Sequence, residues 1–296
     1  MTVLVTGATG TVGSEVVAAL VGRGLAVRAG TRRPGSLPSS LFGAGTLVEP
    51  VRFDFTDPAT FAEAFAGVRT VFLVRPPALS RLSELEPALQ AAAVAGVRHV
   101  VLLSVQGAER IRVLPHARLE QWLRSSTMAW TFLRPSFFDQ NLITVHGPAI
   151  RDLDELVMPA GRGRTAFVDA VDVAEAAALV LAEPAAHQGR AYTLTGTEAL
   201  TYGEVAGVLT AVCGRTIRYT QPGLVRYLLQ ARRKLGMDPT MVATTALVYT
   251  TARLGLAAGL STDLEGLLER RPTSIAEFAR RERAGFSAGF SAEPHA

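Results

Sequence analysis

The sequence is poor in cysteine and lysine, with Cys213 as its only cysteine and Lys234 as its only lysine. A single thiol excludes an intrachain disulfide and a cysteine-based metal cluster, and it favours a reducing, cytoplasmic compartment. No apolar run approaches the roughly twenty residues that span a bilayer, and the first residues lack the basic region of a signal peptide. We therefore expect neither a membrane segment nor export, and no bound metal.

Charge is also scarce, at 19% of the residues against 48% hydrophobic ones, a composition typical of compact globular chains. The net charge of +4 comes from arginines scattered along the sequence. A protein that binds nucleic acid gathers its basic side chains on one surface. We therefore expect a small-molecule ligand and no nucleic-acid partner, with the chain acting as a monomer or a homodimer.

Short apolar runs alternate with helical patterns over the first half of the chain. Strands are predicted at residues 3–5, 25–29, 51–53, 70–74, 97–103 and 130–133, and helices at 13–23, 85–95 and 117–124. Helical crossovers of this length join parallel strands. The sequence predicts an α/β fold, a Rossmann-type doubly wound parallel sheet with a smaller, discontinuous C-terminal lobe.

The alternation fades after about Asn141, and Gly147-Pro148 and Met158-Pro159 indicate loops. A predicted helix from Asp172 to Ala182, with Asp172 as its N-cap, lies between strand-like runs and brings the chain back to the main sheet. The predicted organisation is therefore a nucleotide-binding domain over 1–145, to which 165–195 returns, a smaller substrate-side lobe over 146–164 and 196–286, and a loose tail over 287–296. The helical 222–260 segment of this lobe carries no recognisable chemistry.

Three glycines, Gly7, Gly10 and Gly13, follow the first predicted strand and precede the first predicted helix. In a dinucleotide-binding turn the first glycine permits the tight exit from the strand, the second lets the backbone approach the pyrophosphate, and the third lets the helix pack closely. The helix N-terminus then offers free N–H groups to the phosphates. The residues predicted to contact the cofactor here are Gly7, Thr9, Gly10, Thr11, Val12 and Gly13.

The end of the second predicted strand reads Thr31-Arg32-Arg33, without a carboxylate. An acidic residue at this position would bind a ribose 2′-hydroxyl, whereas a guanidinium suits a 2′-phosphate. The sequence therefore favours NADP(H) over NAD(H), with Thr31, Arg32 and Arg33 as cofactor contacts. A solvated arginine pair in a loop is the alternative.

The Tyr-x-x-x-Lys pair of most short-chain dehydrogenases is missing, because each of the five tyrosines is followed four positions later by Gly, Ala or Arg. In that pair the lysine lowers the pKa of the tyrosine, which exchanges a proton with the substrate. Three alternatives stay open: another residue is the acid, hydride transfer needs none, or the protein turns nothing over.

Taken together, the chain resembles the NmrA-like family of atypical short-chain dehydrogenases/reductases over nearly its whole length. The motifs that carry the resemblance are Thr6 to Gly13, Asp54, Val71 to Val74, Leu103-Ser104, His116-x-x-x-Glu120, Leu133-Arg134-Pro135-x-Phe137-Phe138-x-x-Asn141, Phe167 to Ala174, and Arg271-Pro272-Thr273 with Phe278. The resemblance implies an NADP(H)-dependent oxidoreductase that reduces a flat, apolar quinone, enone or imine. The alternative is an NADP(H)-sensing regulatory protein without turnover, since the family also includes a redox-sensing regulator.

The resemblance further implies a set of cofactor contacts along the strand ends. They are Asp54 and Phe55 at the adenine, Val74, Arg75 and Pro76 over the middle, Ser104, Val105 and Gln106 near the nicotinamide, and Pro135, Phe137 and Phe138 as the far wall. One of the two phenylalanines is expected to stack on the substrate and the other to fill core.

Three residues are candidates for a catalytic role. His116 and Glu120 are one helical turn apart, and a carboxylate neighbour would let His116 hold a proton near neutral pH and act as the acid. The alternative is a histidine that only hydrogen-bonds the cofactor or the backbone. Asn141 could orient a substrate carbonyl or cap the start of the second lobe.

Overall fold

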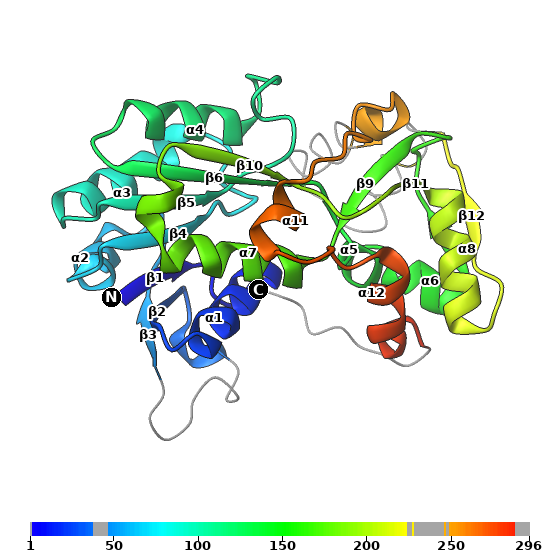
Figure 1. Cartoon of the computed structure of the whole chain (residues 1–296), viewed down its shortest axis with the longest axis horizontal. Helices are drawn as coiled ribbons and strands as arrows, with labels where there is room; N and C mark the ends of the chain where they lie inside the picture. The colour runs from blue at the N-terminus through cyan, green and yellow to red at the C-terminus, as the bar shows by residue number, and fades with distance from the viewer. Residues whose placement is uncertain (1, 38–46, 224–226, 228–245, 247–248, 288–296) are drawn as a thin grey trace. The chain divides into compact units, whose positions relative to one another are not determined.

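The computed structural model describes residues 2–37, 47–223, 227, 246 and 249–287 (Figure 1). Most of the 222–260 segment and nearly all of the predicted 287–296 tail lie outside these residues. The chain forms two compact units. The first takes in Met1–Pro135 and Ala170–Leu194, and the second takes in Ser136–Asp169 and the described residues from Thr195 onward.

The first unit contains a seven-stranded sheet of order β10-β6-β5-β4-β1-β2-β3 in which every pair of neighbours is parallel. The strands are β1 (Thr2–Thr6), β2 (Ala26–Thr31), β3 (Val48–Arg52), β4 (Thr70–Val74), β5 (His99–Leu103), β6 (Ala129–Pro135) and β10 (Arg190–Leu194). The predicted doubly wound parallel sheet is confirmed.

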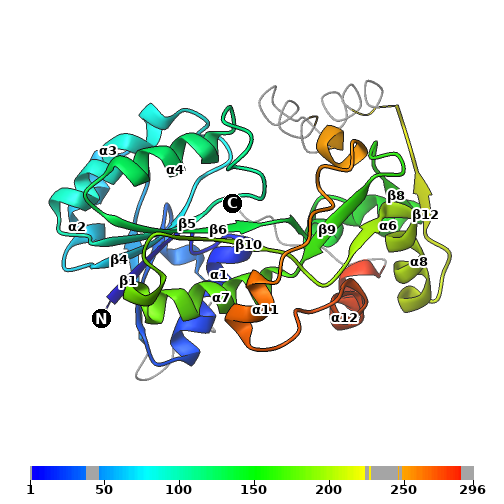
Figure 2. The ribbon, with the colours of Figure 1, turned by 45° about the horizontal axis from the view of Figure 1, so that its top comes forward.

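Helices cover both faces of this sheet (Figure 2). One face carries α1 (Thr11–Gly22) and α7 (Ala170–Ala182), and the other carries α2 (Phe61–Phe65), α3 (Leu82–Val94) and α4 (Pro115–Ser125). Short 3-10 turns occur at η1 (Pro34–Ser36), η3 (Pro58–Thr60) and η4 (Pro184–His187). Because both faces are covered, the apolar residues 3–5 of β1 and 100–103 of β5 are all buried, without alternation between buried and exposed positions.

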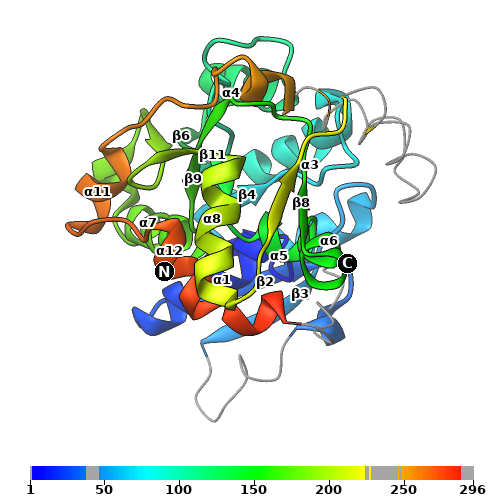
Figure 3. The same ribbon diagram turned by 90° about the vertical axis from the view of Figure 1, so that its right-hand side faces the viewer.

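The second unit has a small three-stranded sheet of order β11-β9-β7 and a parallel two-stranded ribbon of β12 and β8 (Figure 3). Its strands are β7 (Phe137–Phe138), β8 (Glu155–Val157), β9 (Arg164–Val168), β11 (Ala199–Thr201) and β12 (Arg218–Thr220). The helices whose bounds lie within its described residues are α5 (Asn141–Thr144), α6 (Gly147–Leu153), α8 (Tyr202–Cys213), α11 (Asp263–Leu268) and α12 (Ile275–Arg281), followed by the turn η5 (Arg283–Phe286). Tyr202, Phe278 and Phe286 are fully buried in its core.

Three local predictions differ from the structure. Gly147-Pro148 opens helix α6 instead of forming a loop, because proline is tolerated in the first turn of a helix. Helix α7 begins at Ala170, so Asp172 lies within its first turn and is not the N-cap. Of the segment 165–195, which was expected to return to the main sheet, α7 and β10 belong to the first unit, whereas residues 165–168 lie in β9, which pairs with β7 and β11.

None of the helices in the part of the chain that the structure describes combines the length and apolar character needed to span a membrane.

Candidate dinucleotide-binding site

The glycine turn between β1 and α1 is tightly closed. Gly7 has a φ of +63°, in the left-handed region that favours glycine, and its carbonyl oxygen accepts the N–H of Gly10 at 2.9 Å. A Cβ atom at Gly13 would lie only 2.1 Å from that same carbonyl oxygen. Helix α1 can therefore start against the turn only because residue 13 has no side chain.

The N-terminus of α1 is left available to a ligand. Its N-cap is Gly10, so no side chain at this position caps the helix. The first N–H groups of a helix, here those of Thr11, Val12 and Gly13, have no acceptor within the helix, and the helix dipole favours an anion beside them. Together with the close approach at Gly13, these groups fit the diphosphate of a dinucleotide.

Thr6 fixes the neighbouring strand ends in register. Its buried hydroxyl donates to the carbonyl oxygen of Phe72 at 3.1 Å and accepts the N–H of Val74 at 2.8 Å. This side chain therefore joins β1 to β4 where the turn begins. The role of Thr6 was not predicted from the sequence, although a hydroxyl at the end of an apolar strand is a usable signal.

The end of β2 carries the two arginines that the sequence predicts for a 2′-phosphate. Thr31 is buried, and its hydroxyl accepts the backbone N–H of Arg33 at 3.3 Å. The side chains of Arg32 and Arg33 are exposed. Both guanidiniums therefore stand in solvent just past the strand, where they can reach a phosphate.

Asp54 and Phe55, expected at the adenine, differ in what they can offer. The Asp54 carboxylate accepts hydrogen bonds from the backbone N–H of Thr56 at 2.9 Å and from the Thr56 hydroxyl at 2.7 Å. The bond from the Thr56 backbone is the main reason that the pKa of Asp54 is lowered. The Phe55 ring is buried, with its centroid 4.8 Å from that of Phe53. The Phe55 side chain thus belongs to the core, and only its backbone remains for a ligand.

Arg75 organises the segment after β4. Its Nη1 donates to the carbonyl oxygens of Pro76 at 2.9 Å and Leu79 at 2.7 Å, and its Nε donates to His116 Nε2 at 3.4 Å. Val74 lies beside the turn, since its Cβ would be 3.5 Å from a Cβ at Gly7. Val74, Arg75 and Pro76 therefore lie next to the glycine turn.

His116 does not form the expected pair with Glu120. It lies in the first turn of α4, where burial and then the charge of Arg75 lower its pKa to about 3. The ring is therefore neutral near pH 7, and because Nε2 accepts from Arg75, its proton is on Nδ1. This corrects the expectation that His116 holds an acidic proton at neutral pH, since its charged neighbour is a cation.

Glu120 is engaged by two other side chains instead. Its Oε1 accepts the Ser104 hydroxyl at 2.6 Å and Arg134 Nε at 2.9 Å, and its Oε2 accepts Arg134 Nη2 at 2.5 Å. All three side chains are buried. Hydrogen bonding to Glu120 is the main cause of the raised pKa of Arg134. The role of Arg134 was not predicted from the sequence, although one arginine in an apolar strand indicates a buried ion pair.

The residues after β5 continue the sheet past its strand end. The N–H of Ser104 donates to Leu133 O at 2.7 Å, and the N–H of Gln106 donates to Pro135 O at 2.9 Å. Ser104, Val105, Gln106 and Pro135 therefore lie together at the carboxyl end of the sheet, the edge where open α/β sheets bind ligands.

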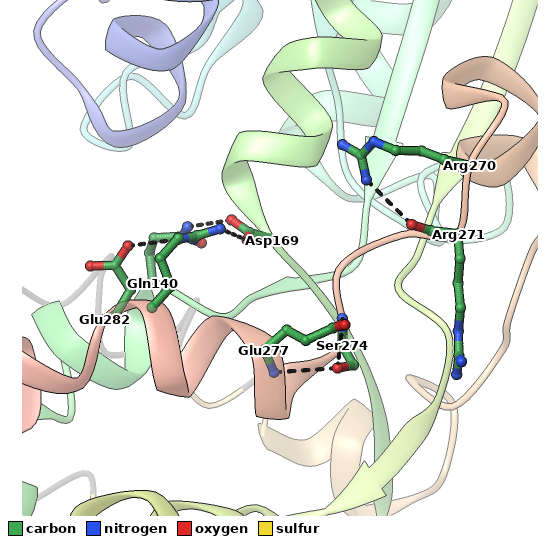
Figure 4. Close-up of polar contacts among 8 residues, drawn as sticks. Gln140, Asp169, Arg270, Arg271, Ser274, Glu277 and Glu282 are labelled. Atoms are coloured by element: carbon green, nitrogen blue, oxygen red, sulfur yellow. Dashed lines mark hydrogen bonds and ion pairs between the residues drawn. The ribbon is translucent and has the colours of Figure 1, made fainter.

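The remaining predicted residues belong to the second unit. The Phe137 ring meets that of Phe167 edge-on, with centroids 5.5 Å apart, and Phe138 is partly exposed at the end of β7. Asn141 is the first residue of α5, so the N-cap position is that of Gln140. Gln140 donates to the buried carboxylate of Asp169 at 2.7 Å (Figure 4). Both phenylalanines are partly buried, and Phe137 packs against the hydrophobic core of the second unit.

Across the described residues, no three His, Cys, Asp or Glu side chains gather into a group that could hold a metal ion.

Known proteins are similar to this chain over nearly its whole length. The model of the NmrA-like family matches residues 1–279. The NAD(P)H azoreductase of Xenophilus azovorans is 34% identical over 97% of this chain and 99% of its own. The NADPH-dependent quinone oxidoreductase of Escherichia coli, solved with NADPH, is 25% identical with a TM-score of 0.82, covering 94% of this chain and 99% of its own. The triphenylmethane reductase of Citrobacter sp., solved with NADP(H), is 26% identical with a TM-score of 0.79, covering 95% and 99%.

Proposed function

The chain belongs to the NmrA-like family, and from this premise we propose that it is an NADP(H)-dependent oxidoreductase that transfers a hydride to a flat, mostly apolar small molecule such as a quinone, an enone or an imine. The glycine turn carries the proposal, because a Cβ atom at Gly13 would lie only 2.1 Å from the carbonyl oxygen of Gly7, so that α1 packs against the turn only with glycine at this position. A dinucleotide site requires this close approach. Similarity to an azoreductase and to quinone and triphenylmethane reductases supports the reductase chemistry.

The residues that would hold the cofactor follow the carboxyl edge of the sheet. The amides of Thr11, Val12 and Gly13 would bind the diphosphate, and the exposed guanidiniums after β2 would bind the 2′-phosphate as a planar fork. The preference for NADP(H) over NAD(H) rests on these guanidiniums and on the absence of a carboxylate at this strand end. The bound nicotinamide would supply the hydride.

The protein's own groups would position the reactants and keep the site's charges fixed. Neutral His116 would act as a hydrogen-bond donor through Nδ1, as a neutral imidazole can beside a developing negative charge. Arg75 would keep His116 in this state, because it occupies Nε2 and disfavours a second positive charge. In this arrangement the proton that follows hydride transfer comes from solvent and not from His116.

The test combines binding and turnover. Calorimetry with NADPH and NADH measures binding, and the fall in NADPH absorbance measures turnover with quinones, enones, imines, azo dyes and triphenylmethane dyes. We expect tighter binding of NADPH and oxidation of NADPH with at least one class of acceptor. Binding without turnover across the whole panel would favour the NADP(H)-sensing regulatory protein, and no binding of either cofactor would exclude both functions.

A further inference from the structure

We propose that Glu120 and Arg134 are positioning residues for the nicotinamide end of the cofactor, acting through Ser104 and the segment that follows it. This inference rests on the proposed function, since it requires a bound dinucleotide. It gives the buried Glu120–Arg134 pair a role beyond stability, and it replaces the catalytic role that the helix spacing suggested for Glu120.

The order of the strands decides which half of the cofactor reaches Ser104. The glycine turn follows β1, and the arginines for the 2′-phosphate follow β2 on one side of it. A dinucleotide lies across the carboxyl ends of the strands, with its two halves on opposite sides of the diphosphate. The nicotinamide half therefore runs toward β4 and β5, and Ser104 to Gln106 are the residues that leave β5.

The ion pair joins three elements directly beneath this edge. Ser104 extends β5, Glu120 lies in α4, and Arg134 lies in β6. The carboxylate receives three charge-assisted hydrogen bonds, of which two come from the guanidinium side by side. Such a fork fixes both the distance and the relative orientation of the guanidinium and the carboxylate, and burial keeps water from competing for their hydrogen bonds. Ser104 is held by its hydroxyl as well as by its backbone.

Arg134 also reaches the loop between β5 and α4. Its Nη1 lies 3.4 Å from Glu109 Oε2, and its chain neighbours Leu133 and Pro135 accept the N–H groups of Ser104 and Gln106. The backbone after β5 is thus tied to β6 on both sides of Arg134. A change in the ion pair should shift the backbone of Ser104 to Gln106, where a nicotinamide ring would rest.

The diphosphate end is built independently of this network. The turn at Gly7 to Gly13 is fixed by its own backbone contacts and by Thr6, none of which involves Glu120 or Arg134. Loss of the ion pair should therefore weaken contacts to the nicotinamide and spare contacts to the phosphates. That separation distinguishes positioning from a general loss of structure.

The experiment measures the dissociation constants of two ligands by calorimetry on the full chain. The ligands are NADPH and 2′-phospho-ADP-ribose, which keeps every phosphate but lacks the nicotinamide. For Ser104→Ala and Glu120→Gln we expect an affinity for NADPH that is about five- to tenfold weaker, the effect of one lost hydrogen bond of ordinary strength. We expect the affinity for 2′-phospho-ADP-ribose to stay within about twofold of the wild type. Glu49→Gln, which removes an exposed carboxylate paired with Arg28 in the same sheet, is the matched control and should change neither.

Two results would overturn the proposal. One is an equal loss of affinity for both ligands, which would mean that the pair serves only to hold the unit together. The other is an unchanged ratio of the two affinities in Ser104→Ala, and this variant decides the matter if Glu120→Gln does not fold. If the wild type binds neither ligand, the proposed function fails first, so the two failures can be told apart.

Discussion

Replacing Gly13 with alanine is the sharpest test of the dinucleotide site. The added Cβ would lie 2.1 Å from Gly7 O, 2.8 Å from Gly7 C and 3.2 Å from the Cα of Ala8, all of them backbone atoms that cannot rotate away. Ordinary contact begins at 3.4 Å, so helix and turn must separate by about 1.3 Å. Hydrogen bonds with donor–acceptor distances near 2.9 Å do not survive a displacement of this size.

The expected magnitudes follow from this clash. Overpacking of this kind costs about 1–3 kcal/mol in the free energy of unfolding, and it outweighs the gain of up to about 1 kcal/mol that alanine brings to a helix. We expect Gly13→Ala to unfold at lower urea concentration and to bind NADPH at least tenfold more weakly, because the amides of α1 leave their positions.

Gly22→Ala provides the matched control on the same helix. A Cβ atom there meets nothing within 4 Å. Urea denaturation should show an unchanged or slightly higher stability, and calorimetry should show unchanged NADPH binding. If Gly13→Ala bound NADPH as tightly as Gly22→Ala does, the close approach at residue 13 would have no part in the site and the reasoning would be refuted.

Three further predictions concern charge and protonation. Replacing Arg32 and Arg33 together by alanine should weaken NADPH binding at least tenfold and leave NADH binding nearly unchanged, because only a 2′-phosphate needs the guanidiniums; equal losses for both cofactors in calorimetry would contradict this. The pH profiles of kcat for the wild type and for His116→Asn should run parallel between pH 5 and 8, because His116, with a pKa of about 3, does not titrate there; a limb near pH 6.5 that disappears in the variant would show that His116 is the acid after all. Burial lowers the pKa of His146 to about 4, and an unfolded histidine titrates near 6.5, so the unfolded chain takes up the proton first as the pH falls. The contribution of this group to the free energy of unfolding should be fully present above about pH 6.5 and smaller by about 3 kcal/mol at pH 4. As the pH is lowered, the urea midpoint should fall less steeply in His146→Gln than in the wild type.

The fold and the phosphate turn were accessible from sequence because their signals are local. Apolar runs separated by helical patterns predict parallel strands, and three glycines between the first strand and helix have meaning only at that place. The structure gives Gly13 the close contact that the motif requires. The ends of the helices were harder to predict from the sequence. Helix α6 is an example, since a Gly-Pro pair is compatible with both a loop and the first turn of a helix.

The partners of the polar residues could not be read from spacing. His116 and Glu120 share a helix face by the i, i+4 rule, yet Glu120 binds Arg134 from β6 and Ser104 from the end of β5. A buried carboxylate is stable only where a cation and further donors satisfy it, and those donors come from other strands. Helix spacing alone carries no information about them.

The parallel sheet, the glycine turn and the pair of arginines at the end of β2 were therefore predictable from the amino-acid order, because each depends on residues close together in the chain. The lowered pKa of His116 and the contact of Glu120 with Ser104 emerge only once the chain is folded, because burial and the approach of Arg75 and Arg134 produce them. Charge and proton positions depend on neighbours in space, which the order of residues does not reveal.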